Sequence, residues 1–152
     1  TDGFVTAGHA YNTGDPAYYN NTLIGSCDFS IQGGSVDAAF ISITNFSIVP
    51  NNGNLTGEEY NIWAGDNVTK LGETIAQSEG YITSTNANVN ADGIYYTDMG
   101  EATYLSAFGD SGGPVYLTDS KKVIGIHKGS TAFTSIFVKV DNIASKLNAH
   151  FN

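Results

Sequence analysis

The chain has 152 residues, enough for one domain or for two small lobes that share a cleft. Its 15 acidic residues against 6 lysines and no arginine give a formal charge of −9, which disfavours a nucleic-acid or anionic-membrane partner. A single cysteine rules out an intrachain disulfide, and no apolar run reaches the roughly 18 residues of a membrane span.

The first third of the chain predicts short strands around a histidine and an aspartate. Residues 3–6 form a short strand that leads to His9, and residues 8–22 are rich in Gly, Asn, Tyr and Asp-Pro, which predicts a loop. A further strand over 35–43 carries Asp37 among apolar neighbours. The turn-rich stretch 50–54 then predicts the crossing between an N-terminal lobe, 1–50, and a C-terminal lobe, 51–152.

The remainder of the chain predicts more strands, separated by clusters of Gly, Asn and Asp. This spacing is typical of an all-β barrel or sandwich, and the 18 glycines agree with many tight turns. The expected strands lie near 60–64, 80–85 and 93–98, in a hairpin of 114–118 with 123–127, and over 136–140.

The chain ends in a predicted amphipathic helix. Asp141 or Asn142 is suited to cap its first turn, and Ile143, Leu147 and Phe151 fall on one face at helical spacing. We therefore expect this helix to pack one apolar face on the strands.

The most specific motif is the stretch 109–114, Gly-Asp-Ser-Gly-Gly-Pro, centred on Ser111. A serine hydroxyl is a poor nucleophile at neutral pH, so it needs a nearby imidazole and a set of donors for the oxyanion. His9, in Thr-Ala-Gly-His, is the candidate base, and glycines beside Ser111 let backbone amides approach a substrate.

Asp37 completes a candidate triad. Burying a carboxylate beside Val36, Ala38 and Phe40 is costly unless it has a partner, and an imidazole N–H is such a partner. Alternatively, Asp37 lies on a solvated strand face. The order His, Asp, Ser is the one found in chymotrypsin, whereas triads on other folds use other orders.

The serine motif also fits the Gly-x-Ser-x-Gly turn of α/β-hydrolases. That fold requires a helix after the serine, followed by an acid and a histidine. Here the strand-like stretch 114–117 follows Ser111, which argues against an α/β-hydrolase.

The histidine motif resembles that of the bacterial chymotrypsin-like peptidases of the alpha-lytic protease and streptogrisin group, and the serine motif resembles theirs too. The stretch 123–130, Val-Ile-Gly-Ile-His-Lys-Gly-Ser, with the strand and helix after it, is similar to the C-terminal part of glutamyl endopeptidases. The resemblance implies two β-barrels with the triad between them, and hydrolysis of polypeptide substrates through an acyl-enzyme.

Under this resemblance each site residue has an expected role. His9 is the general base, Asp37 orients it and Ser111 attacks the carbonyl, while the N–H groups of Gly109 and Ser111 form the oxyanion hole. No metal ion or other cofactor is expected, and the protein is expected to be secreted. The alternative is a protease-fold binding or surface protein that has lost catalysis.

The resemblance to glutamyl endopeptidases implies a substrate preference. The residues that match their acidic pocket are Ser106, His127 and Ser130. A histidine that donates a hydrogen bond, with serine hydroxyls beside it, suits a carboxylate, so cleavage after Glu or Asp is expected. Alternatively, His127 is a strand residue satisfied by a backbone carbonyl.

Two departures from the family pattern are evident. The counter-charge of Asp110 is unidentified, because the chain has no arginine; Lys70, an N-terminal amine and a neutral hydrogen-bond network are the alternatives. Relatives also place about two strands before the histidine motif. We therefore expect a cleaved N-terminal segment or a partner chain to complete the first barrel, whose strand edges would otherwise invite pairing.

Overall fold

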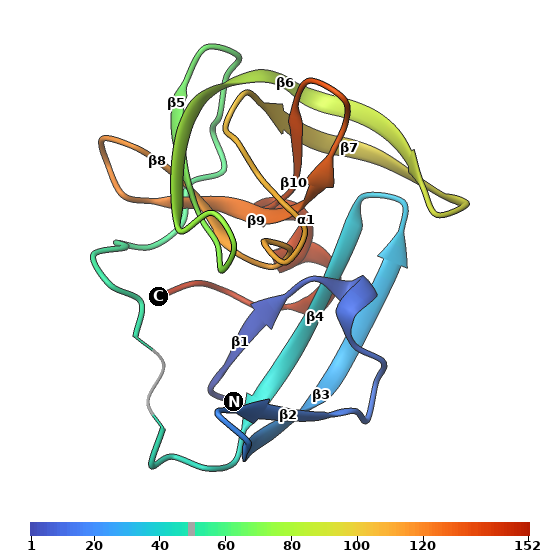
Figure 1. The fold of residues 1–152 in the computed structure, drawn as a ribbon, viewed down its shortest axis with the longest axis vertical. Coiled ribbons are helices and arrows are strands. Elements are labelled where there is room, and N and C mark those ends of the chain that lie inside the picture. The colour runs from blue at the N-terminus through green and yellow to red at the C-terminus, as the bar shows by residue number, and fades with distance from the viewer. Residues whose placement is uncertain (49–50) are drawn as a thin grey trace.

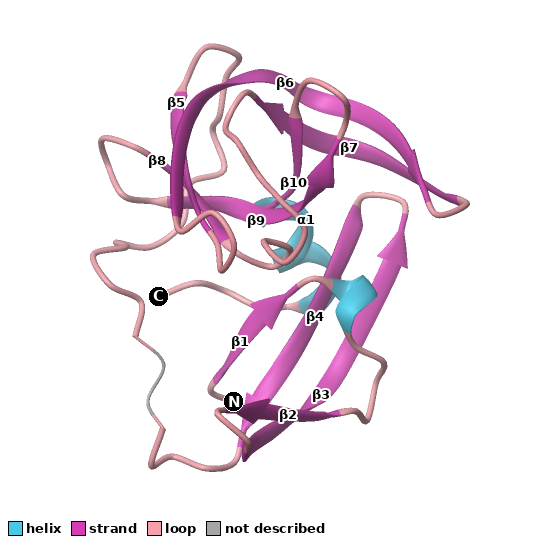
Figure 2. Ribbon diagram, in the orientation of Figure 1, coloured by secondary structure: helices cyan, strands magenta, loops and turns pink. Residues whose placement is uncertain are grey.

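The computed structural model describes residues 1–48 and 51–152, and strands make up most of its regular structure. Figures 1 and 2 show a small N-terminal sheet beside a larger C-terminal barrel, with the helix α1 where the two meet. The predicted all-β fold with two lobes and a C-terminal helix is confirmed. The first lobe is an open sheet and not a closed barrel.

The N-terminal lobe is a four-stranded antiparallel sheet in the order β1-β4-β3-β2. Its strands are β1 (Gly3–Thr6), β2 (Pro16–Tyr19), β3 (Thr22–Gly33) and β4 (Val36–Ile43). The prediction of a loop throughout 8–22 is wrong at β2, which pairs with β3. Proline is tolerated there because Pro16 is the first residue of an edge strand and needs no ladder donor.

Strand β4 is buried along almost its whole length because it lies between two apolar clusters. Ala39 and Ile41 pack inside the N-terminal lobe. Val36 and Ala38 instead contact the cluster that joins the two lobes. The strand that carries Asp37 is therefore fixed from both sides.

The C-terminal lobe is a closed barrel in the order β10-β7-β6-β5-β8-β9. Its strands are β5 (Asn67–Leu71), β6 (Gln77–Ala91), β7 (Ile94–Ala102), β8 (Pro114–Leu117), β9 (Val123–Ser130) and β10 (Ser135–Lys139). The predicted hairpin corresponds to β8 and β9, which pair antiparallel.

The strand predicted near 60–64 is absent from the described chain. Instead, Glu58 makes a single bridge to Val123, and the chain then turns. Asp66 holds this turn, since its carboxylate accepts the Trp63 N–H at 2.9 Å. An aspartate that binds backbone three residues away competes with strand pairing.

Helix α1 runs over Val140–Leu147, two residues before the start that the sequence suggested. Lys139 occupies the N-cap position without a side-chain hydrogen bond, so the predicted capping by Asp141 or Asn142 is wrong. Ile143 and Leu147 are buried against the cluster between the lobes.

Phe151 does not belong to the apolar face of this helix, because the helix ends before it. Asn148 closes the helix in the left-handed conformation, with φ of 50°. A non-glycine residue tolerates that region best when it is asparagine.

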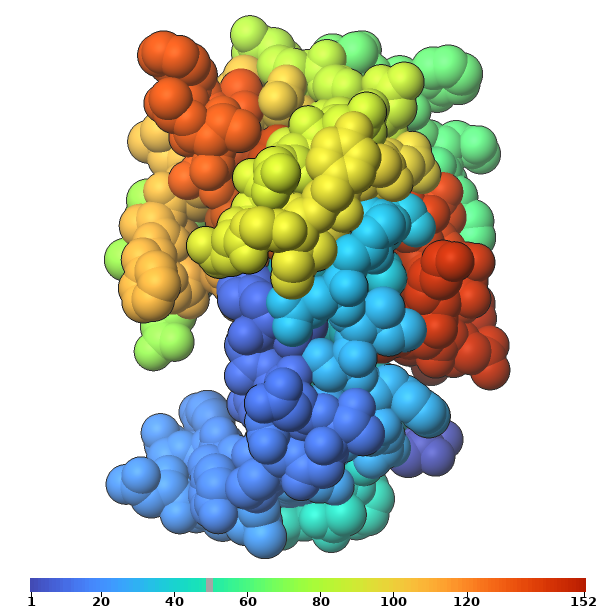
Figure 3. Space-filling view, turned by 90° about the vertical axis from the view of Figure 1, so that its right-hand side faces the viewer, coloured from blue at the N-terminus to red at the C-terminus, as the bar shows by residue number. Residues whose placement is uncertain are grey.

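The lobes also meet through the β6–β7 hairpin, which lies over the turn between β3 and β4 in Figure 3. The Gly34 N–H donates to the Tyr95 carbonyl at 3.3 Å, and the Thr97 N–H donates to the Gly34 carbonyl at 2.8 Å. The predicted lobe boundary at residue 50 lies outside the described residues and stays a prediction.

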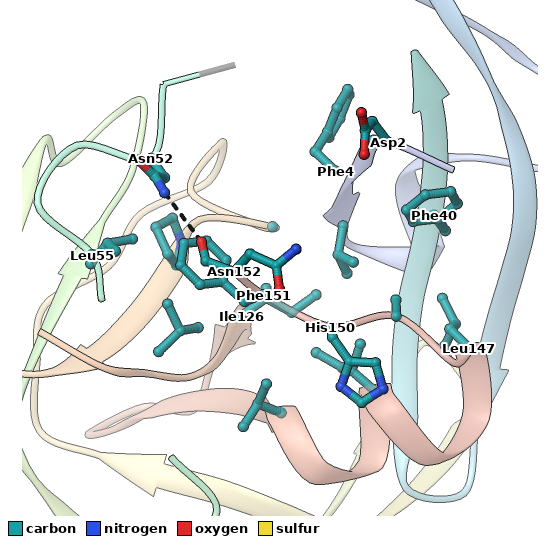
Figure 4. Close-up of a pocket in the computed structure, with 18 of the residues that line it drawn as sticks. Asp2, Phe4, Phe40, Asn52, Leu55, Ile126, Leu147, His150, Phe151 and Asn152 are labelled. Carbon is teal, nitrogen blue, oxygen red and sulfur yellow. Dashed lines mark hydrogen bonds between the residues drawn. The ribbon is translucent and has the colours of Figure 1, made fainter. Parts of the chain in front are cut away.

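A pocket of about 1070 Å³ lies between β1, β4, α1 and the C-terminal segment, as Figure 4 shows. Phe4, Phe40 and Leu147 line it, and Asn52 donates to the Asn152 carbonyl at 3.2 Å across one side. His9, Asp37 and Ser111 are not among its lining residues, whereas Gly112, which follows Ser111, is one of them. The neighbouring β1 is an edge strand, and a segment that completes this lobe remains a prediction.

Candidate active site

His9 and Asp37 form a two-point contact. The His9 ring Nδ1 lies 2.8 Å from Asp37 Oδ2, and the His9 backbone N–H donates to Asp37 Oδ1, also at 2.8 Å. Asp37 is fully buried, whereas the His9 side chain is 39% exposed. The carboxylate thus fixes one edge of the imidazole while solvent reaches the ring.

Gly8 permits this contact. It opens the short 3₁₀ helix η1 (Gly8–Ala10), and a Cβ at this position would lie 2.9 Å from Asp37 Oδ1 and 2.8 Å from the Ala38 nitrogen. Any side chain would push η1 away from β4. Glycine before His9 is therefore a steric requirement for the His9–Asp37 pair.

Asp37 has two charged or hydrogen-bonding partners. Burial alone would raise its pKa, but hydrogen bonds from His9 and Lys128, with the charge of Lys128, outweigh burial and lower the pKa below its ordinary value. Asp37 is therefore ionised at neutral pH, as an acceptor for an imidazole N–H must be.

Ser111 lies on a tight loop that packs against the chain just before His9. Gly109 and Gly112 have φ of 102° and 88°, which favours glycine at both positions. A Cβ at Gly112 would lie 3.0 Å from the Ala7 nitrogen. The Gly112 N–H also donates to the His127 carbonyl at 2.8 Å, which ties the loop to β9.

The predicted oxyanion donors lie on the same loop. Within residues 1–48 and 51–152, the N–H groups of Gly109 and Ser111 donate to no carbonyl and no side chain. Asp110, between them, holds the loop by accepting the Ala107 N–H at 3.0 Å. Both N–H groups are thus available to a substrate oxygen.

Lys70 is the counter-charge of Asp110, which the sequence left open among three alternatives. Both side chains are fully buried, and Lys70 Nζ donates to Asp110 Oδ2 at 2.6 Å. Asp110 also accepts the backbone N–H groups of Thr74 and Ile75. Burial would raise the pKa of Asp110, but these contacts, led by Lys70, hold it far below its usual range.

Ser111 is not hydrogen-bonded to His9 among the described residues. Its Oγ donates instead to the backbone carbonyl of Lys128, at 3.0 Å. Catalytic hydrogen bonds often tighten only when substrate is present, and rotation about one side-chain bond reorients a serine hydroxyl.

Two of the three predicted specificity residues belong to one buried network. His127, in β9, has its Nδ1 2.8 Å from the Tyr104 hydroxyl. The Tyr104 carbonyl accepts Ser135 Oγ, which in turn lies 2.8 Å from Ser106 Oγ. Ser130 is exposed and pairs in register with Ser135, and its side chain makes no hydrogen bond to the residues that the structure describes.

His127 is neutral at neutral pH. Its burial and the charge of Lys70 lower its pKa to about 4. Tyr104 is also neutral, since burial raises its pKa well above the usual value. When the Tyr104 hydroxyl donates to Nδ1, the imidazole proton lies on Nε2, so this ring acts as a neutral donor.

Four residues of this region have functions that motif reading alone did not assign. Tyr104 and Ser135 complete the His127 network, while Lys70 and Lys128 hold the two buried aspartates. In the sequence, each lysine stands close to β-branched residues that favour a strand, in 67–71 and in 123–130, and this was the signal available for both.

No three His, Cys, Asp or Glu side chains of 1–48 and 51–152 gather as a metal-ion cluster. In that same part of the chain, no helix has the length and apolarity to span a membrane.

No family model and no curated protein matches the chain. Solved structures do. The Nocardiopsis protease NAPase is 23% identical with a TM-score of 0.84, over 96% of this chain and 82% of that one. Thermobifida fusca protease A is 25% identical with a TM-score of 0.80, over 96% of this chain and 82% of that one. A third structure is that of a glutamic-acid-specific serine protease, which uses a histidine triad in substrate binding. It is 24% identical with a TM-score of 0.84, over 99% of this chain and 86% of that one. The chain therefore has the chymotrypsin-like fold of bacterial serine proteases.

Proposed function

We propose that this protein is a serine endopeptidase that hydrolyses peptide bonds through an acyl-enzyme. The observation that carries the proposal is the His9–Asp37 pair, in which a buried carboxylate accepts both the ring and the backbone N–H of one histidine. Ser111 lies on the adjoining loop, with two N–H groups available beside it.

The proposed reaction uses these groups in sequence. Ser111 Oγ attacks the peptide carbonyl carbon as its proton passes to His9 Nε2, and the carbonyl oxygen accepts the Gly109 and Ser111 N–H groups. His9 then gives the proton to the leaving amine, and the carbon–nitrogen bond breaks. Water hydrolyses the acyl-enzyme by the same route. Asp37 keeps the imidazole oriented and stabilises its charged form throughout.

The competing proposal is a binding protein with this fold and no catalysis. It draws on one observation, the hydrogen bond from Ser111 Oγ to the Lys128 carbonyl in place of one to His9. We favour the enzyme because His9, Asp37, Gly109 and Ser111 are all present and the buried aspartates are compensated.

We further propose a preference for glutamate, and secondarily aspartate, before the scissile bond. The buried network of Tyr104, His127, Ser135 and Ser106 supports it, because it orders a neutral imidazole donor and hydroxyl groups close to the Ser111 loop. Ser130, at the end of β9, would add a further hydroxyl. Polypeptides outside the cell remain the expected substrates.

A panel of peptides that differ only in the residue before the scissile bond tests both proposals. We expect kcat/KM for Glu to exceed that for Gln by about tenfold to a hundredfold, the scale of a hydrogen bond to a charged group. Tyr104→Phe should reduce this ratio, because it removes the hydroxyl that fixes the His127 tautomer while keeping the ring. Ser111→Ala is the control for activity. A preference for Phe, Leu or Lys would end the glutamate proposal and leave the endopeptidase proposal intact.

A further inference from the structure

Lys128 is a buried cation at the centre of the candidate active site. It lies in β9, with a side chain only 7% exposed, and its Nζ is 2.6 Å from Asp37 Oδ2. The same Nζ lies 3.7 Å from the centre of the Tyr96 ring. Burying an ammonium group is costly without such partners, so its position is set by Asp37 and Tyr96 together.

Lys128 and His9 share one oxygen of the carboxylate. Asp37 Oδ2 takes the Lys128 ammonium at 2.6 Å and the His9 ring Nδ1 at 2.8 Å, while Oδ1 takes the His9 backbone N–H. Two hydrogen-bond lengths therefore separate the lysine charge from the imidazole. The Lys128 carbonyl is also the acceptor of Ser111 Oγ. One residue thus touches both the acid and the nucleophile of the proposed triad.

We propose that Lys128 is a positioning residue that sets the charge state in which His9 works. This inference rests on the proposed function, since it concerns the same triad. Its ammonium neutralises Asp37, so the Asp37–Lys128 pair carries no net charge before the reaction.

The consequence follows from the charges at the proton-transfer step. When the Ser111 proton moves to His9, the group His9, Asp37 and Lys128 passes from neutral to one net positive charge. Without the lysine it would pass from one negative charge to neutral, which is easier because the new positive charge then forms beside an uncompensated carboxylate. Lys128 therefore makes protonation of His9 less favourable and extends activity toward acidic pH.

The other groups around Asp37 do not supply this effect. Tyr96, facing it from β7, is neutral, because burial together with Asp37 and Asp92 raises its pKa to about 12. The charges that act on Asp37 come from His9 on η1 and from Lys128 on β9. Removing the Lys128 charge is thus a specific perturbation of the pair.

The test is the pH dependence of fluorophosphonate labelling of Ser111 in four proteins: the unchanged chain, Lys128→Gln, Lys128→Met and Lys128→Arg. Gln keeps a donor for Asp37 without charge, Met removes both, and Arg keeps the charge. In a plot of labelling rate against pH, we expect the midpoint of the acidic limb to lie about one pH unit higher in the Gln and Met variants, because a unit charge near the imidazole is lost. In the Arg variant, which keeps the charge, this midpoint should not move.

Lys139→Gln is the matched control. Lys139, in β10, makes an ion pair of the same length with Asp98, at 2.6 Å, although the Asp98 side chain is 45% exposed; neither is hydrogen-bonded to His9, Asp37 or Ser111 among the described residues. It should not move the acidic limb.

Three results would overturn the inference. These are an unshifted limb in a folded Lys128→Gln variant, an equal shift in the Lys139→Gln control, and failure of both neutral Lys128 variants to fold while Lys128→Arg folds. The last result would mean that the charge of Lys128 is required for folding and would give it no separate role in catalysis. Absence of labelling in the unchanged chain would instead contradict the proposed function itself, so the two failures are distinguishable.

Discussion

Replacing Asp37 with asparagine is expected to slow the reaction of Ser111 with a fluorophosphonate by about 10⁴-fold, the scale for this change in a Ser-His-Asp triad. Each oxygen of Asp37 accepts at least one donor: the His9 backbone N–H at Oδ1, and the His9 ring and Lys128 at Oδ2. An asparagine amide must put its NH₂ against one of these donors, so either the imidazole tautomer or the His9 backbone is disturbed.

Asp28→Asn is the matched control for this change. Asp28 lies in the same sheet and accepts one hydrogen bond, from Ser42 Oγ at 2.8 Å, which an amide oxygen can still accept. The labelling rate of Ser111 in Asp28→Asn should stay within about a factor of two of the rate in the unchanged chain, as for most substitutions away from buried networks. Equal labelling rates of Ser111 in Asp37→Asn and Asp28→Asn would show that Asp37 is not a member of the triad.

Replacing Lys70 with methionine is expected to lower the free energy of unfolding by about 3–5 kcal/mol at neutral pH, the usual cost of removing one partner of a buried ion pair. Lys70 and Asp110 are both fully buried, and the lysine also donates to the Ile75 carbonyl at 2.9 Å. The variant leaves a buried carboxylate with backbone donors only. Chemical denaturation at pH 7 measures the loss.

The same ion pair predicts how stability responds to acid. The pKa of Asp110 is lower in the folded chain than its ordinary value of 3.8, so its ionised form stabilises the fold above about pH 4. This contribution is lost as the pH falls below that value toward the folded pKa. Lys70→Met removes the main cause of the low pKa, so the part of the stability that is lost on acidification below about pH 4 should be smaller in this variant than in the unchanged chain.

Two further variants make this prediction specific. The double variant Lys70→Met with Asp110→Asn removes both charges and should lose less stability than Lys70→Met alone. Lys122→Met removes an exposed lysine and should change the free energy of unfolding by less than about 0.5 kcal/mol. A Lys70→Met variant as stable as Lys122→Met would contradict the account of Asp110.

The parts of the site that could be predicted from the sequence are those written in a few adjacent residues. His9 and Ser111 each lie in a short motif whose glycines have a geometric reason, as Gly8 and Gly112 show. Asp37 was recognisable because a carboxylate among apolar strand residues needs a buried partner. The roles of all three in catalysis stay predictions until measured.

The buried lysines could not be assigned in the same way, because their partners lie far along the chain. Lys70 contacts an aspartate 40 residues away, and Lys128 contacts one 91 residues away. Strand alternation in the sequence places Lys128 and His127 on opposite faces of one strand, but it does not identify the partner of the lysine. Lys128 reaches Asp37 through the contact between the two lobes, whereas Lys70 reaches Asp110 within the C-terminal barrel, where β5 pairs with β8.

The fold was predictable as a class but less so by element. Alternation and turn residues indicated β4 and the β8–β9 hairpin, whereas β2 lies in a stretch that local composition made a loop. The erroneous strand near 60–64 has apolar residues of the right type, but the Asp66 side chain takes a backbone donor and turns the chain. A local hydrogen bond from the backbone to a side chain thus outweighs the strand propensity of this stretch.

The central claim is that Ser111 is a nucleophile activated by His9. The most direct measurement is intact-mass analysis of the protein after reaction with a fluorophosphonate at pH 8, alongside Ser111→Ala and His9→Ala. We predict one adduct per chain, located at Ser111 by peptide mapping, with none in Ser111→Ala and at least a thousandfold slower labelling in His9→Ala, on the scale that loss of a triad member costs. An unlabelled wild-type chain, or an adduct that persists in Ser111→Ala, would contradict the claim.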